Sequence, residues 1–221
     1  MKTSGFISRE WILWLLILAP LTLVLARWSD YPAKIPTHWN AAGEVDDYGG
    51  KGALFLSPLI NTGLYLLLLL LPKIDPRKKN YNLFGGAYWI IRIALAFLLS
   101  GIGFVTCLAS LGYRIDVGTI VPIAVFALFM IMGNQFARIR SNYFVGLRTP
   151  WTLNSEEVWT RTHRVTGRIW VAASAIMIVL SFFLKGETLF VVMIPYIVIL
   201  SVFPFVYSWK LWKDSQQNEV K

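Results

Sequence analysis

A set of seven side chains with binding chemistry lies in one segment, residues 28–52, between two long apolar stretches. They are His38, Trp39, Asn40, Glu44, Asp46, Asp47 and Lys51. Such a set can bind a peptide, a lipid headgroup or a divalent cation. For a cation, the spacing matches no standard calcium loop. Gly50-Lys51-Gly52 lacks the first glycine and the final serine or threonine of a phosphate-binding loop. We therefore predict neither a metal site nor a cofactor.

This segment is expected to be an ordered surface structure. Pro32 and Pro36 push the residues before them toward extended backbone, and Asn40 to Gly43 supply turn chemistry. Trp39 has a second interpretation, as an aromatic anchor at a membrane interface.

A second segment, residues 138–168, carries another group of polar side chains. Asn142 and Arg148 stand in its irregular part, where a fixed arginine holds backbone carbonyls or a carboxylate. For both residues a structural role and a functional role remain open. Asn154 and Glu157 resemble a capping box, which predicts a short helix over 155–166.

The two faces of this short helix differ in character. At 100° per residue, one face carries Trp159, Thr162, His163 and Thr166, and the opposite face carries Arg161, Arg164 and Arg168. The arginines suit either contact with lipid headgroups or a docking surface for a cytoplasmic partner.

The elements that must position these residues are membrane helices. Of the 221 residues, 56% are hydrophobic and 15% are charged, which is less charge than a soluble domain carries. Six apolar stretches approach the roughly 20 residues that a spanning helix needs: 11–27, 53–71, 88–112, 118–137, 166–184 and 188–209. We expect one membrane domain, 1–221, of the all-α class: a polytopic bundle of six transmembrane helices.

Lysine and arginine positions predict the orientation of this bundle. With the amino terminus inside, fifteen of the 21 basic residues fall on the cytoplasmic side, five fall outside and Arg92 lies within a span. Both termini are therefore expected in the cytoplasm, with an outer loop over 28–52 and a cytoplasmic loop over 138–165. The net charge of +9 follows from this bias, so it implies no direct contact with nucleic acid.

A small membrane transporter, a membrane-embedded enzyme and a structural subunit of a larger complex are the alternative classes. Catalysis is disfavoured because His38 and His163 fall on opposite sides of the membrane and Cys107 lies within a span. Transporters usually keep several ionisable residues within their spans. Here Arg92 is the one such residue, and its side chain is expected to reach the inner interface. Asn61 and Tyr65 suit a polar contact between helices.

The two loops together resemble a known bacterial family. The outer loop, Ile35-Pro36-Thr37-His38-Trp39-Asn40 with Gly43 and Asp46, is similar to the hallmark of a widespread bacterial membrane domain. The inner loop resembles the signature of the SdpI family over Asn142-Tyr143-Phe144-Val145-Gly146-Leu147-Arg148-Thr149-Pro150-Trp151-Thr152-Leu153, continuing to Val158-Trp159 and Thr162-His163-Arg164. The resemblance covers nearly the whole chain, and Ser141 stands where many relatives have proline.

This resemblance implies an immunity protein of the bacterial cell membrane that protects against an extracellular toxic peptide, as members of this family do against a sporulation-delaying toxin of bacilli. In the best-known member it also implies capture of a small winged-helix repressor at the membrane. Toxin recognition is then expected in the outer loop, at Pro36, His38, Trp39, Asn40, Gly43 and Asp46. Contact with the partner is expected in the cytoplasmic loop, at Asn142, Gly146, Arg148, Pro150, Trp151, Trp159, Arg161, His163 and Arg164.

Overall fold

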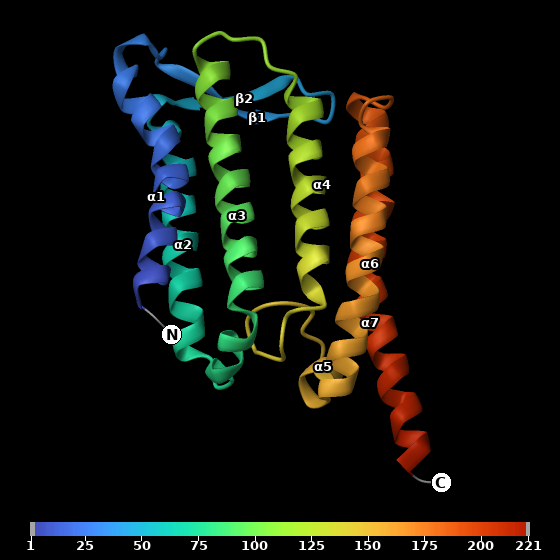
Figure 1. Cartoon of the computed structure of the whole chain (residues 1–221). Coiled ribbons are helices and arrows are strands. Elements are labelled where there is room, and N and C mark those ends of the chain that lie inside the picture. The colour runs from blue at the N-terminus through green and yellow to red at the C-terminus, as the bar shows by residue number, and fades with distance from the viewer. Residues whose placement is uncertain (1–2, 220–221) are drawn as a thin grey trace.

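Long helices standing side by side make up most of the structure, a computed structural model that describes residues 3–219 and the side chains of residues 10–217 (Figure 1). The long helices are α1 (Thr3–Ala26), α2 (Leu56–Ile74), α3 (Tyr81–Ser110), α4 (Val117–Phe136), α6 (Glu156–Leu180) and α7 (Gly186–Glu219). Lys2, Lys221 and the side chain of Arg9, which the charge count places in the cytoplasm, lie outside the described parts.

These helices form in the apolar stretches because a bilayer offers the backbone no hydrogen-bonding partner and a helix satisfies its own backbone. Within the described residues, five helices are long and apolar enough to cross a membrane, and the apolar part of α1, Glu10–Ala26, is shorter. The prediction of a mostly helical chain with several apolar helices is confirmed. That all six helices cross the membrane, with both termini in the cytoplasm, stays a prediction.

The long helices form two groups of three. α1, α2 and α3 pack on one another, α4 and α7 both pack on α6, and the contact of α3 with α4 joins the groups (Figure 1). The contact of α4 with α6 is especially close, because a Cβ placed on Gly133 would lie 2.9 Å from the carbonyl oxygen of Gly167.

The expectation of an all-α chain needs a correction, because the expected outer loop contains a β-hairpin. Strands β1 (Lys34–Trp39) and β2 (Val45–Gly50) pair antiparallel, with irregular register on both sides of His38. The hairpin lies across the ends of the helices, beside two short 3-10 helices, Trp28–Asp30 and Lys51–Phe55 (Figure 1). Helix packing fixes its base, since Ile35 is buried in a cluster with Val24, Leu54 and Cys107.

At the opposite end, the expected boundaries also need a correction. The short helix predicted over 155–166 and the span predicted from 166 are one continuous helix, α6, because no proline interrupts them. Its cap is Ser155, whose hydroxyl accepts from the Val158 nitrogen, and not Asn154. Asn154 instead ends a separate helix, α5 (Pro150–Asn154), and a third 3-10 helix, Lys78–Asn80, precedes α3. The predicted faces of α6 are confirmed: the face with Trp159 is buried and the arginine face is exposed.

Candidate functional site

Asn40 builds the turn at the tip of the hairpin. Its side-chain oxygen accepts from the backbone nitrogens of Ala42 and Glu44, both at 3.0 Å. Its amide nitrogen has no partner among the described residues. Gly43 completes the turn with φ of +82°, a conformation that favours glycine. Asn40 and Gly43, two residues of the predicted recognition loop, therefore have a structural role in forming the turn.

The tip of the hairpin rests directly on backbone of the second group of helices. A Cβ on Gly43 would lie 2.9 Å from the backbone nitrogen of Gly118, at the start of α4. A Cβ on Gly186, at the start of α7, would lie 3.5 Å from the Cα of Ala42. Because Gly43, Gly118 and Gly186 have no side chains, the hairpin backbone can lie close to the first residues of both helices.

His38 and Asp46 form a pair across the hairpin, with 2.6 Å between the histidine Nδ1 and the aspartate oxygen. Both side chains are substantially exposed, at 66% and 42%. An exposed pair of this kind contributes little to stability, so it remains available to a ligand. Pro36, by contrast, is buried at the base of the hairpin.

The lower part of the hairpin is anchored through Tyr31. Its ring is buried beside Ile35 and Cys107. Burial raises the pKa of the Tyr31 hydroxyl well above its usual value. Tyr31 is therefore a neutral core residue at any physiological pH.

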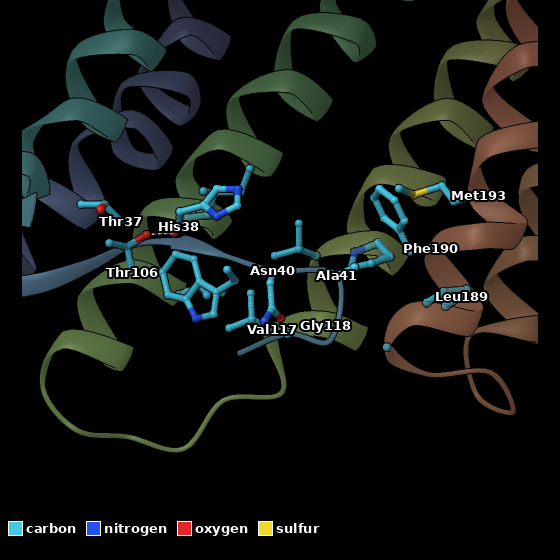
Figure 2. Close-up of a pocket in the computed structure, with 17 residues that line it drawn as sticks. Thr37, His38, Asn40, Ala41, Thr106, Val117, Gly118, Leu189, Phe190 and Met193 are labelled. Atoms are coloured by element: carbon cyan, nitrogen blue, oxygen red, sulfur yellow. Dashed lines mark hydrogen bonds between the residues drawn. The ribbon is translucent and has the colours of Figure 1, made fainter. Parts of the chain in front are cut away.

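Beneath the hairpin tip lies a cavity of about 380 Å³, here called the hairpin pocket. It is lined by hairpin residues 37–41 and 43, by Ile102, Val105 and Thr106 of α3, by Val117, Gly118, Val121 and Pro122 of α4, and by Gly186, Leu189, Phe190 and Met193 of α7. Figure 2 shows His38 and Thr106 on one side, Leu189, Phe190 and Met193 on the other, and Asn40 between them. The structure thus brings His38, Trp39, Asn40 and Gly43 together on one cavity, whereas Pro36 and Asp46 do not line it.

At the opposite end, buried Asp75 fastens the loop after α4 to the loop after α2. Its carboxylate accepts from the backbone nitrogens of Arg77 at 2.7 Å and Tyr143 at 3.0 Å. The Tyr81 hydroxyl donates to the same carboxylate at 3.1 Å. Arg77 donates in turn to the Leu153 carbonyl at 2.8 Å. Sequence analysis missed this cluster, since a single aspartate after an apolar helix gives no sign of a partner 68 residues away.

Asn142 is fully buried and shapes the loop that follows it. Its side-chain nitrogen donates to the carbonyls of Arg140 and Val145, both at 2.9 Å. Its side-chain oxygen accepts from the backbone nitrogens of Phe144 and Val145, at 2.9 Å and 2.6 Å. Every hydrogen-bonding group of Asn142 is used within the chain, which supports a structural role.

His163 holds the same loop from the side of α6. Its Nε2 accepts from the backbone nitrogen of Leu147 at 2.9 Å, so its Nδ1 carries the proton and donates to the Trp159 carbonyl at 2.8 Å. The Trp159 indole stacks on this imidazole, with 4.1 Å between centroids, and donates to the Ile139 carbonyl. Gly146 packs against the imidazole, and its φ is +102°.

The remaining residues of the predicted partner surface lie nearer the solvent. Arg148, Pro150, Arg161 and Arg164 are exposed, and Trp151 is half-buried, with its ring 5.6 Å from that of Phe205. The structure therefore separates the predicted set into buried supports and exposed groups. The exposed groups are the ones a macromolecule can reach.

Arg92 differs from the expectation that its side chain reaches the interface. It is 4% exposed and donates both terminal nitrogens to Glu10 of α1, at 2.6 Å and 3.0 Å. The Tyr65 hydroxyl also donates to Glu10, at 2.7 Å. The near carboxylate neutralises the guanidinium and accepts from both terminal nitrogens, so extension to the interface is unnecessary, while the buried Nε has no partner among the described residues. Asn61 does make the predicted interhelical contact, donating to Ser100 at 3.0 Å.

Among the described residues, no group of three or more His, Cys, Asp or Glu side chains is placed to hold a metal ion.

Comparisons with known proteins match both loop regions. Residues 138–208 match the model of the SdpI/YfhL protein family, and residues 15–62 match a domain of unknown function, DUF1648. The chain is 29% identical to the immunity protein SdpI of Bacillus subtilis (strain 168) over 182 residues, which cover 82% of this chain and 85% of that protein. No solved structure matches. The resemblance to the SdpI family is confirmed, and the chain is a multi-pass membrane protein.

Proposed function

We propose that this chain is an SdpI-like immunity protein that protects a bacterial cell from an extracellular toxic peptide. Similarity to a curated immunity protein over most of both chains supports the class. The observation that carries the proposal is the hairpin pocket, where His38, Trp39 and Asn40 of the hallmark loop face residues of α3, α4 and α7. Three elements of the helical bundle and the hairpin thus converge on one binding site.

Binding, and not catalysis or transport, is the activity that this geometry supports. His38 pairs with Asp46, and His163 is enclosed at the other end of the bundle by Trp159 and Leu147. The two ionisable groups within the helices, Arg92 and Glu10, form an ion pair with each other. We therefore assign the chain a recognition function and no catalytic residue.

A signalling function is a second proposal, and it concerns the predicted cytoplasmic side. Arg148, Arg161 and Arg164 are exposed there, on a loop and helix that Asp75, Asn142 and His163 hold in place. A fixed basic surface suits a protein partner such as a winged-helix repressor. In this proposal the repressor contacts DNA and the chain itself does not.

Survival of a toxin-sensitive strain that lacks its own immunity genes tests the main proposal. Expression of the wild-type chain should raise survival in the presence of the sporulation-delaying toxin. His38→Ala and Trp39→Ala should lower survival while the amount of protein in the membrane stays constant. Equal loss of protein and protection for Trp39→Ala would instead identify an interfacial anchor.

Asn40 allows a sharper comparison, because its oxygen builds the turn and its nitrogen is free. Asn40→Asp keeps the oxygen acceptors and removes the donor, so the turn should form and protection should fall. Asn40→Ala removes both and should also reduce the amount of protein. Full protection by His38→Ala, Trp39→Ala and Asn40→Asp, each at normal abundance, would remove the hairpin from the mechanism.

A further inference from the structure

The lining of the hairpin pocket carries almost no charge. None of its described lining residues is an aspartate, glutamate, lysine or arginine, and His38 is the one histidine among them. Most of the helical lining is aliphatic or aromatic, as at Val121, Leu189 and Phe190. Burying a charge without a partner is costly, so the pocket favours an uncharged occupant. Its volume, about 380 Å³, lies at the small end of the range for ligand pockets.

A second cavity adjoins the hairpin pocket on the side of α3 and α4. It has a volume of about 610 Å³ and shares Ile102, Val105 and Val121 with the pocket. All its lining side chains are apolar, and they come from α1, α3 and α4. Along α3 the lining extends from Val105 to Ile90, which corresponds to about 22 Å at 1.5 Å per residue.

This second cavity opens on the outer surface of the helices. Phe97 and Ile120 line it and are 66% and 47% exposed, on helices whose length and composition suit a membrane. The polar rim of the hairpin pocket is therefore continuous with an apolar groove that opens within the bilayer. At the rim, the free amide nitrogen of Asn40 can donate to a carbonyl oxygen.

We infer that the pocket and groove bind an uncharged, apolar segment of a peptide that has already entered the outer leaflet of the membrane. An apolar side chain occupies the pocket, a peptide carbonyl accepts from Asn40, and the neighbouring apolar residues follow the groove between α3 and α4. This inference rests on the proposed function and specifies its ligand. A charged peptide that approaches from water does not match this lining.

Photocrosslinking at two phenylalanines tests the placement. Phe190 lines the pocket, whereas Phe183 is 78% exposed in the turn between α6 and α7 and lines neither cavity. Each is replaced by p-benzoylphenylalanine, cells are exposed to the toxic peptide of the survival assay, and peptide attached to the protein is measured after illumination. We expect at least tenfold more attached peptide at position 190 than at 183. Equal yields, or attachment of phospholipid alone at position 190, would overturn the inference.

Filling the pocket provides a second measurement that does not depend on crosslinking. Val121→Phe adds volume where pocket and groove meet, and Val191→Phe makes the same change at a position of α7 that is 63% exposed and lines neither cavity. Val121→Phe should lower survival at least tenfold at normal abundance, whereas Val191→Phe should protect like the wild type. Should Val121→Phe fail to accumulate, the crosslinking result decides.

Different results would overturn the immunity function and the apolar binding route. If the wild-type chain gives no protection, the proposed function is wrong. If the wild-type chain protects and Val121→Phe protects equally well at equal abundance, the proposed immunity function is retained. Binding of the peptide in the hairpin pocket and the apolar groove is then wrong.

Discussion

Gly146 is the residue whose replacement the structure tolerates least in the inner loop. Its φ of +102° is strained for any residue with a side chain, and a Cβ there would lie 2.5 Å from the Nε2 of His163. That nitrogen accepts from Leu147, so a clash would also break this hydrogen bond.

We expect Gly146→Ala to reduce the free energy of unfolding by about 1–3 kcal/mol, the usual cost of such backbone strain. The measurement is the thermal unfolding temperature of purified protein in detergent. Gly63→Ala is the matched control, because Gly63 is helical and a Cβ there meets nothing within 4 Å. Equal unfolding temperatures for the two variants would contradict the role given to Gly146.

The pair of Glu10 and Arg92 gives a second prediction at this scale. Glu10→Gln keeps the shape of the side chain but leaves the buried Arg92 without its counter-charge. Removing one partner of a buried pair costs about 3–5 kcal/mol, whereas replacing both costs much less. Membrane abundance should therefore fall for Glu10→Gln and recover in Glu10→Gln with Arg92→Gln. A double variant as poorly expressed as the single one would show that the charge pairing is unimportant.

Residue types predicted the two faces of α6 and left other features of the chain hidden. The arginine face of α6 follows from helical periodicity alone. The pairing of Arg92 with Glu10 joins residues 82 positions apart, so local pattern contains no trace of it. Leu189, Phe190 and Met193 of the hairpin pocket resemble any lipid-facing residues of an apolar helix, and the fold is what selects them.

Among the elements, α6 joins a solvent-facing end to an apolar end in one rigid helix. Arg161 and Arg164 lie on its exposed end, and Arg161 pairs with Glu157 at 3.2 Å, both side chains being more than half exposed. Exposed pairs contribute little to stability, so changing these arginines should leave the fold intact.

Replacing Arg161 and Arg164 together by Glu should abolish toxin-dependent recruitment of a fluorescent repressor to the membrane, and survival should persist. The reversed charge repels a partner that needs a basic surface. Lysine at both positions keeps the charge and should keep recruitment. Undiminished recruitment by the glutamate variant would exclude this face as the docking surface. Loss of recruitment and survival together would indicate a structural role for these residues.

The elements could be predicted from sequence where a single physical cause dominates. Apolar length predicts the helices because the bilayer imposes one solution on the backbone. The hairpin was not predicted as strands, because Pro36, Gly49 and Gly50 are poor strand formers and its pairing depends on the helix ends beneath it. Similarly, the change from polar to apolar composition near residue 166 predicts a boundary between two helices. The backbone of α6 continues through this change without a break.

The arrangement of the whole molecule rests on the proposal of one membrane domain, 1–221, with both termini in the cytoplasm. Cysteines at Ala41 and Ser215 test it, with labelling of intact cells by an impermeant thiol reagent. The native Cys107 is 1% exposed, so it should contribute little background. Ala41 alone should react, since it lies at the hairpin tip and Ser215 near the end of α7. Reaction at Ser215 in intact cells would contradict the predicted topology.

The distance along the chain between Glu10 and Arg92 also determines when the pair can form during synthesis. A ribosome that adds roughly 5–20 residues per second needs about 4–16 s for the 82 residues between them. During that interval α1 and α2 are completed, and the carboxylate of Glu10 lacks the guanidinium of Arg92. A nascent chain interrupted before residue 92 therefore carries an unneutralised acid, whereas one interrupted in the loop after α3 already contains all three helices of the first group.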